Sequence, residues 1–191
     1  METSLLFTPS LDDAIAISAG LLVVRLIVGL LMAAHGAQKL FGWLGGHGLE
    51  ATAGRFEQIG FRPGRVFATL AGGTELASGL LVALGLLGPV GPALMLLVMI
   101  VAAVSVHWKF GIFAASNGIE LALLYATAAF GLAFTGPGVF ALDTVFGIEA
   151  AWTWPLVLGA LALGVVGGVA TLSARRVAPA ASGAPAAAHA A

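Results

Sequence analysis

The chain has 191 residues and a formal net charge of −1; 60% of its residues are hydrophobic and only 9% are charged. A soluble domain usually carries about 25% charged residues, so these side chains are too few to cover a surface that faces water. The composition therefore predicts an all-α integral membrane protein, since hydrocarbon tolerates an apolar exterior. The balanced charge leaves no basic field for nucleic acid, and the absence of cysteine excludes thiolate chemistry and disulfides.

Five apolar segments approach the length of about 20 residues that a helix needs to cross a bilayer. We predict membrane-spanning helices over residues 14–36, 66–87, 90–108, 117–135 and 152–173. Their apolar runs are continuous rather than alternating, which favours a helical bundle over a β-barrel.

The connections between these helices predict the orientation of the chain. Basic residues outside the spans all fall on one side of a five-span arrangement: Lys39, Arg55, Arg62, Arg65, Lys109, Arg175 and Arg176. The other side receives the acidic residues Glu2, Asp12, Asp13, Asp143 and Glu149. Because basic loops stay in the cytoplasm, we expect a plasma (inner) membrane protein with its N-terminus outside and its C-terminus in the cytoplasm.

Between the first two spans, LEATAGRFEQI at residues 49–59 predicts an amphipathic helix on the cytoplasmic surface. The predicted spans also divide the chain into four parts. The predicted parts are an extracytoplasmic N-terminus (1–13), a four-helix core (14–145), an added fifth helix (146–174) and a disordered Ala/Pro-rich cytoplasmic tail (175–191).

One polar pattern occurs twice in the predicted core. His35 and Lys39 end the first span as His107 and Lys109 end the third, and Glu-Leu-Ala occurs at Glu75 and again at Glu120. Two interpretations stay open: a duplicated two-helix hairpin, or a chance similarity in a chain of biased composition.

Three charges fall inside predicted spans: Arg25, Glu75 and Glu120. Each costs roughly 2.5–3.5 kcal/mol at the bilayer centre, so we expect them to face the bundle and to be paired. One interpretation is a structural Arg25–Glu75 ion pair, although side chains lean toward helix N-termini and would carry these two apart. The other is a polar pocket for a ligand head group or a proton path.

The histidines also allow two interpretations. His35 and His107 either face headgroup water, or converge with Lys39, Lys109 and Glu120 at a cytoplasmic mouth that binds an anion or relays protons. No metal site is expected there, because the lysines repel cations.

The segment VRLIVGLLMAAHGAQKLFGWLGGH at residues 24–47 resembles the start of the DoxX family of small bacterial membrane proteins. The similarity continues through GFRPGRVFATLAGGTELASGLLVALGLLGPVGP and a helix that ends in His107, to TGPG before Leu142-Asp143. The residues that match polar positions of the family pattern are Arg25, His35, Gln38, Lys39, Glu75, His107 and Glu120. They are our candidates for ligand binding or proton relay; no catalytic residue is assigned.

The resemblance implies a membrane subunit or anchor of a quinone-linked or redox-stress oxidoreductase system. Such a subunit is an accessory rather than a self-sufficient enzyme: it has no intrinsic cofactor, binds quinone, and receives electrons from a soluble or membrane redox partner protein. Two alternatives stay open. One is a non-enzymatic scaffold or assembly protein in the lipid bilayer; the other is a small-solute carrier, which so few helices would form only as a homo-oligomer.

Overall fold

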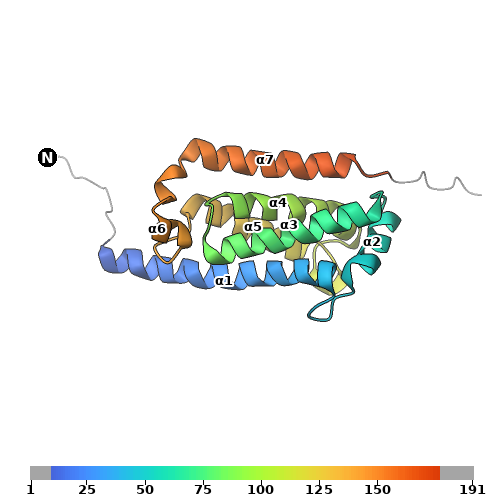
Figure 1. Ribbon diagram of the computed structural model, residues 1–191, viewed down its shortest axis with the longest axis horizontal. Coiled ribbons are helices and arrows are strands. Elements are labelled where there is room, and N and C mark those ends of the chain that lie inside the picture. Colours follow the sequence, from blue (N-terminus) through green and yellow to red (C-terminus); the bar gives the residue numbers. More distant parts are fainter. Residues whose placement is uncertain (1–9, 177–191) are drawn as a thin grey trace, which may run out of the picture.

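Residues 10–176, the part of the chain that the computed structural model describes, contain helices and no β-strand. Five apolar helices run along a common axis (Figure 1): α1 (Leu11–Phe41), α3 (Gly64–Leu84), α4 (Val90–Ala102), α5 (Glu120–Thr135) and α7 (Trp154–Ser173). Four helical segments are long and apolar enough to cross a membrane, with α4 counted through Phe110, whereas α5 has 16 residues. The predicted all-α membrane fold is confirmed.

Short helices connect these spans. They are α2 (Gly48–Gln58), a π-helix (Ala103–His107), α6 (Leu142–Phe146) and 3-10 turns at Trp108–Phe110, Ala114–Ser116 and Glu149–Ala151. α2 confirms the helix predicted over 49–59 and packs against α3; its placement on the membrane surface stays a prediction. Of the predicted N-terminal and C-terminal parts, residues 1–9 and 177–191 lie outside the described residues.

The first helix begins earlier than the hydropathy predicts. Ser10 Oγ accepts a hydrogen bond from the Asp13 backbone N–H at 3.1 Å, and the Asp13 carboxylate accepts one from the Ser10 backbone N–H at 3.0 Å. This reciprocal capping box satisfies two backbone donors and starts the helix at Leu11 rather than at residue 14. α1 therefore has 31 residues, whereas α3 has 21. This difference in length determines where the charged residues of α1 lie relative to α3.

Glycines set the register between α1 and α3, which lie side by side. A Cβ atom on Gly36 would lie 2.6 Å from the Gly72 carbonyl oxygen, and one on Gly29 would lie 2.6 Å from that of Gly79. Such backbone contact is typical of small residues at membrane-helix interfaces. In this antiparallel register, Lys39 lies level with the middle of α3, whereas Arg25 lies level with the turn after α3.

α4 lies at the centre of the bundle and packs against α3, α5 and α7. α7 runs along the side of the molecule away from α1 (Figure 1) and approaches α4 closely, because a Cβ atom on Gly164 would lie 2.5 Å from the Ala93 carbonyl oxygen. After α7, the Arg176 backbone N–H donates to the Gly60 carbonyl oxygen at 2.7 Å. The predicted fifth helix is thus an integral wall of the bundle.

The bundle has two chemically different ends. What we call the Lys39 end holds the end of α1, α2, the start of α3, the π-helix and the end of α7; the Asp143 end holds the start of α1, the α3–α4 turn, α6 and the start of α7. The basic residues outside the spans all fall at the Lys39 end, as the sequence predicts. Which end faces the cytoplasm stays a prediction.

Candidate functional site

A cavity of about 450 Å³ opens at the Lys39 end between α1, α2, α3, the end of α4 and α7. Apolar side chains form most of its wall, among them Phe56, Phe67 and Leu97. Lys39, Glu75 and His107 also line it. This volume and this mixture of an apolar wall with a few polar groups are typical of sites for small organic ligands.

Lys39 and Glu75 form an ion pair in this cavity. Lys39 Nζ lies 2.6 Å from Oε1 and 2.5 Å from Oε2 of Glu75, and the exposed fractions of the side chains are 30% for Lys39 and 5% for Glu75. A side chain leans toward the N-terminus of its own helix, so in antiparallel α1 and α3 these two lean toward each other. The charge of Glu75 is thereby compensated, while Lys39 stays accessible from the cavity.

An Arg25–Glu75 ion pair, one of the two interpretations of the charges inside the spans, is wrong. Arg25 is 2% exposed and donates from Nη2 to the Phe140 carbonyl oxygen at 2.8 Å and from Nη1 to that of Pro137. The register of α1 against the shorter α3 places its guanidinium beside Gly85, after the end of α3. Arg25 therefore belongs to the Asp143 end of the bundle.

The Asp143 end also buries an acidic residue, Asp143, which by sequence we expect only as a peripheral charge outside the spans. Its side chain is fully buried; it accepts hydrogen bonds from the backbone N–H groups of Leu87 at 2.8 Å and Gly88 at 2.6 Å, and from Trp152 Nε1 at 2.8 Å. It thus ties α6 to the α3–α4 turn and to the start of α7. The feature of the sequence that indicates this role is a single acidic residue in the otherwise apolar segment FALDTVFG.

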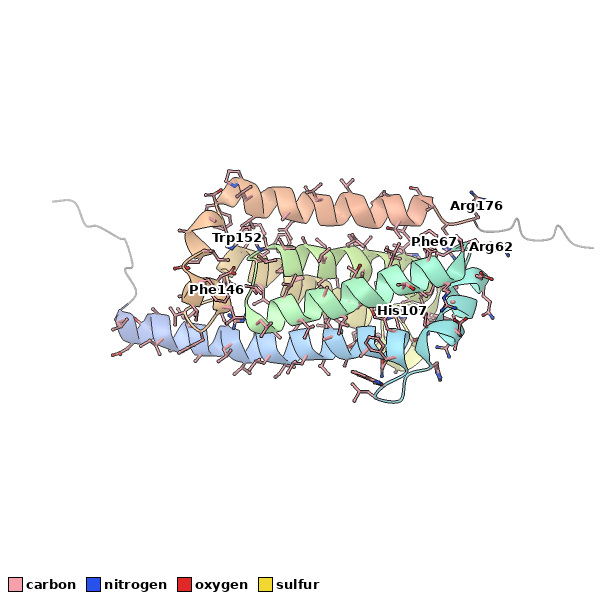
Figure 2. The ribbon with its side chains drawn as sticks, viewed as in Figure 1. Arg62, Phe67, His107, Phe146, Trp152 and Arg176 are labelled. Carbon is pink, nitrogen blue, oxygen red and sulfur yellow. The ribbon has the colours of Figure 1, made fainter. Side chains whose placement is uncertain are left out.

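His107 reaches the Lys39 cavity from the π-helix that ends α4 (Figure 2). Its Nδ1 lies 2.8 Å from the Asn117 carbonyl oxygen. A carbonyl oxygen only accepts hydrogen bonds, so Nδ1 carries a proton, and in the neutral ring Nε2 is the free base. A π-helical turn is a frequent feature of functional sites, and here it ends at the one histidine of the cavity wall.

The other candidates lie outside the cavity wall. His35 is exposed, with its ring centroid 6.0 Å from that of Tyr125 in an edge-to-face arrangement. Gln38 Nε2 donates to the Leu44 carbonyl oxygen at 3.0 Å and so holds the loop after α1. Glu120 accepts from the Ala114 backbone N–H at 2.7 Å. Of the groups expected to converge at one mouth, only Lys39 and His107 line the cavity.

The two Glu-Leu-Ala segments also differ in place. Glu75 lies in the interior of α3, whereas Glu120 is the first residue of α5 and is partly exposed. The chain between the π-helix and α5 turns through left-handed positions at Gly111 and Asn117, which delays the start of α5. The sequence similarity between the two hairpins is therefore not matched by an equivalent environment for the two carboxylates.

The model of the DoxX family matches residues 20–108. This segment is a DoxX domain. It contains Arg25, His35, Gln38, Lys39, Glu75 and His107 and ends before Glu120 and Asp143. The similarity that we expect over residues 109–145 lies outside the matched segment and stays a prediction. No curated protein and no solved structure matches the chain.

The DoxX domain supplies nearly the whole Lys39 cavity, because α2, α3, α4 and most of α1 fall within it. The exception is Thr171, by which α7 completes the wall from outside the domain.

Proposed function

We propose that this DoxX-domain membrane protein is a subunit or anchor of a quinone-linked or redox-stress oxidoreductase system, and that its Lys39 cavity binds a quinone head group. The observation that carries the proposal is the meeting of Lys39, Glu75 and His107 in one largely apolar cavity. The apolar wall suits a quinone ring and its tail, and the Lys39 ammonium suits a carbonyl oxygen of the ring.

Bound quinone would accept electrons and protons from outside the chain. Lys39 would hold the quinone by a charge-assisted hydrogen bond, which Glu75 positions by fixing the ammonium. His107, with Nδ1 directed to Asn117, would present Nε2 to the cavity and carry a proton between it and the water at this end of the bundle. Electrons would come from a partner redox protein, so the chain acts as an accessory rather than as an enzyme by itself.

The orientation that agrees with this role has the Lys39 end in the cytoplasm and the N-terminus outside the plasma membrane. The support for it is the clustering of basic residues outside the spans at this end. A soluble redox partner would then meet the cavity end of the molecule directly, beside α2.

Quinone binding is the test. We would titrate purified protein with decylubiquinone and measure binding by calorimetry for wild type, Lys39→Met, Glu75→Gln and the cavity-filling Ala71→Phe, with Glu120→Gln as the control outside the cavity. We expect at least tenfold weaker binding in the first three variants and an unchanged Kd in the control. Unchanged binding in folded Lys39→Met and Ala71→Phe would refute the site. No binding at all, together with a protein partner that is retained by Lys39→Met, would favour the scaffold alternative.

A further inference from the structure

A second cavity of about 450 Å³ lies at the Asp143 end, far along the bundle from the Lys39 cavity. Its wall comes from the start of α1, the α3–α4 turn, the end of α5 with its following loop, α6 and the start of α7. Of the wall residues, Gly88 and Pro89 lie within the matched DoxX segment, Ser18 precedes it, and the others follow residue 108. Nothing in the function proposed above uses this cavity.

Three aromatic side chains line it: Phe134, Trp152 and Trp154. The rings of Phe134 and Trp154 have centroids 5.4 Å apart. Trp152 is held by its hydrogen bond to Asp143, and its ring packs against Gly88 so closely that a Cβ atom there would lie 2.5 Å from the ring. The position of Trp152 is therefore fixed before any ligand arrives.

The charge of this cavity is negative. Among the residues that line it, all within the described part of the chain, Glu149 alone is charged, and its side chain is exposed. The nearby Arg25 is buried and is not a wall residue itself; it donates to backbone carbonyl groups, one of them that of the wall residue Pro137. The field at the mouth thus attracts cations.

Two hydroxyl groups of the wall, those of Thr135 and Thr144, leave acceptors rather than donors for a ligand, whereas Ser18 Oγ accepts from the Val139 backbone N–H at 3.2 Å and keeps its proton. Thr135 Oγ1 donates to the Gly131 carbonyl oxygen at 3.1 Å, and Thr144 Oγ1 donates to that of Gly138 at 3.2 Å. Each hydroxyl has one proton and two lone pairs, so a hydroxyl whose proton is used can still accept. A phosphate or carboxylate would find no cationic donor in this wall.

From these observations we infer that the Asp143-end cavity binds an organic ammonium group. Indole and phenyl faces attract such cations, and a carboxylate beside them adds a direct charge interaction. The group has two sources with the same chemistry: the ethanolamine or choline head of a phospholipid, or a small soluble amine.

The first test uses tetramethylammonium as the probe. Full-length protein in nanodiscs of phosphatidylglycerol alone, which carries no amine, is titrated with tetramethylammonium chloride against matched sodium chloride, and tryptophan emission is followed. We expect a saturable change in wild type and a Kd at least fivefold weaker in Glu149→Gln, which keeps all four tryptophans. Glu50→Gln and Trp108→Leu, both at the Lys39 end, are the controls and keep the response.

The second test distinguishes the two sources. Phosphatidylethanolamine is added to the same nanodiscs, and its competition with tetramethylammonium is measured. Competition identifies a lipid head group; tetramethylammonium binding without competition identifies a soluble amine. The inference is overturned if tetramethylammonium gives no saturable change, or if Glu149→Gln and Trp154→Leu both bind it as wild type does. Neither result affects the quinone proposal, because that site lies at the other end.

Discussion

The two ends of the bundle each bury one acidic side chain near one basic side chain, and they use the charges differently. At the Asp143 end, Asp143 accepts from two backbone N–H groups and an indole, while Arg25 donates to two backbone carbonyl groups. At the Lys39 end, Lys39 and Glu75 bond chiefly to each other and face a cavity. Charges that bond to backbone groups of distant segments join those segments, whereas a pair beside a cavity keeps a donor for a ligand.

This contrast predicts that substitutions at the Asp143 end lower the free energy of unfolding more than substitutions at the Lys39 end do. Asp143→Ala leaves buried donors of Leu87, Gly88 and Trp152 without an acceptor and Arg25 without its neighbouring counter-charge. Removing one partner of such a buried network costs about 3–5 kcal/mol. We expect the variant to unfold far below wild type in detergent thermal scans. Asp12→Ala, at an exposed position, is the control; an equal Tm for the two would remove the distinction between the ends.

The next largest effect concerns the close contact between α1 and α3, which fixes the register of these two helices. In Gly79→Ala the new Cβ atom would lie 2.9 Å from Ala33 Cα, so the helices must separate, at a cost of about 1–3 kcal/mol. Gly73→Ala on the same helix meets nothing within 4 Å and gains helix propensity.

Thermal unfolding of these two alanine variants measures the difference directly. We expect Gly79→Ala to be destabilised and Gly73→Ala to be as stable as wild type or more so. Equal stability would show that the close contact does not determine the register.

Substitutions at the Lys39 end should weaken the proposed ligand binding while lowering the free energy of unfolding only modestly. Lys39→Met leaves the Glu75 carboxylate unpaired, but the cavity admits water, so we expect a loss of only about 1–2 kcal/mol. The double variant Lys39→Met/Glu75→Gln should lose less than the sum of the single variants, because it removes both charges. Chemical denaturation of wild type, the two single variants and the double variant gives the coupling free energy between Lys39 and Glu75. A loss as large as that of Asp143→Ala would make this pair a structural anchor too.

The smallest effect belongs to the exposed ion pair between Arg65 and Glu50, whose side chains are 68% and 74% exposed. Such pairs contribute about 0.2–1 kcal/mol and are screened by salt. Arg65→Ala should therefore unfold within about 0.5 kcal/mol of wild type in high salt. A larger loss would mean that α2 is held to α3 mainly by charge.

Much of the fold could be read from the chain because membrane helices depend on local composition. Continuous apolar runs predict five helices, and the amphipathic segment predicts α2, within a few residues. The capping of α1 was missed although its signal, Ser10 followed by Asp13, is local. The clustering at one end of the basic residues outside the spans also follows from the sequence once the number of spans is known.

For the candidate site, the sequence supplied the right residue types and the wrong partners. Lys39, Glu75 and His107 were all candidates, yet Glu75 was paired with Arg25 rather than Lys39. The lean of side chains toward helix N-termini already separated Arg25 from Glu75, and applied to Lys39 it would have brought Lys39 and Glu75 together.

The sequence by itself determined the helical membrane fold, the positions of the buried charges along each helix, and the difference between a basic and an acidic end. Only the tertiary structure decided which charges meet, since that depends on the register that Gly29, Gly36 and Gly79 allow between α1 and α3. It also decided that Asp143 is buried, because two of its hydrogen-bond donors, the backbone N–H groups of Leu87 and Gly88, come from a distant part of the chain. Composition and helical spacing are local quantities, whereas contacts between helices are not.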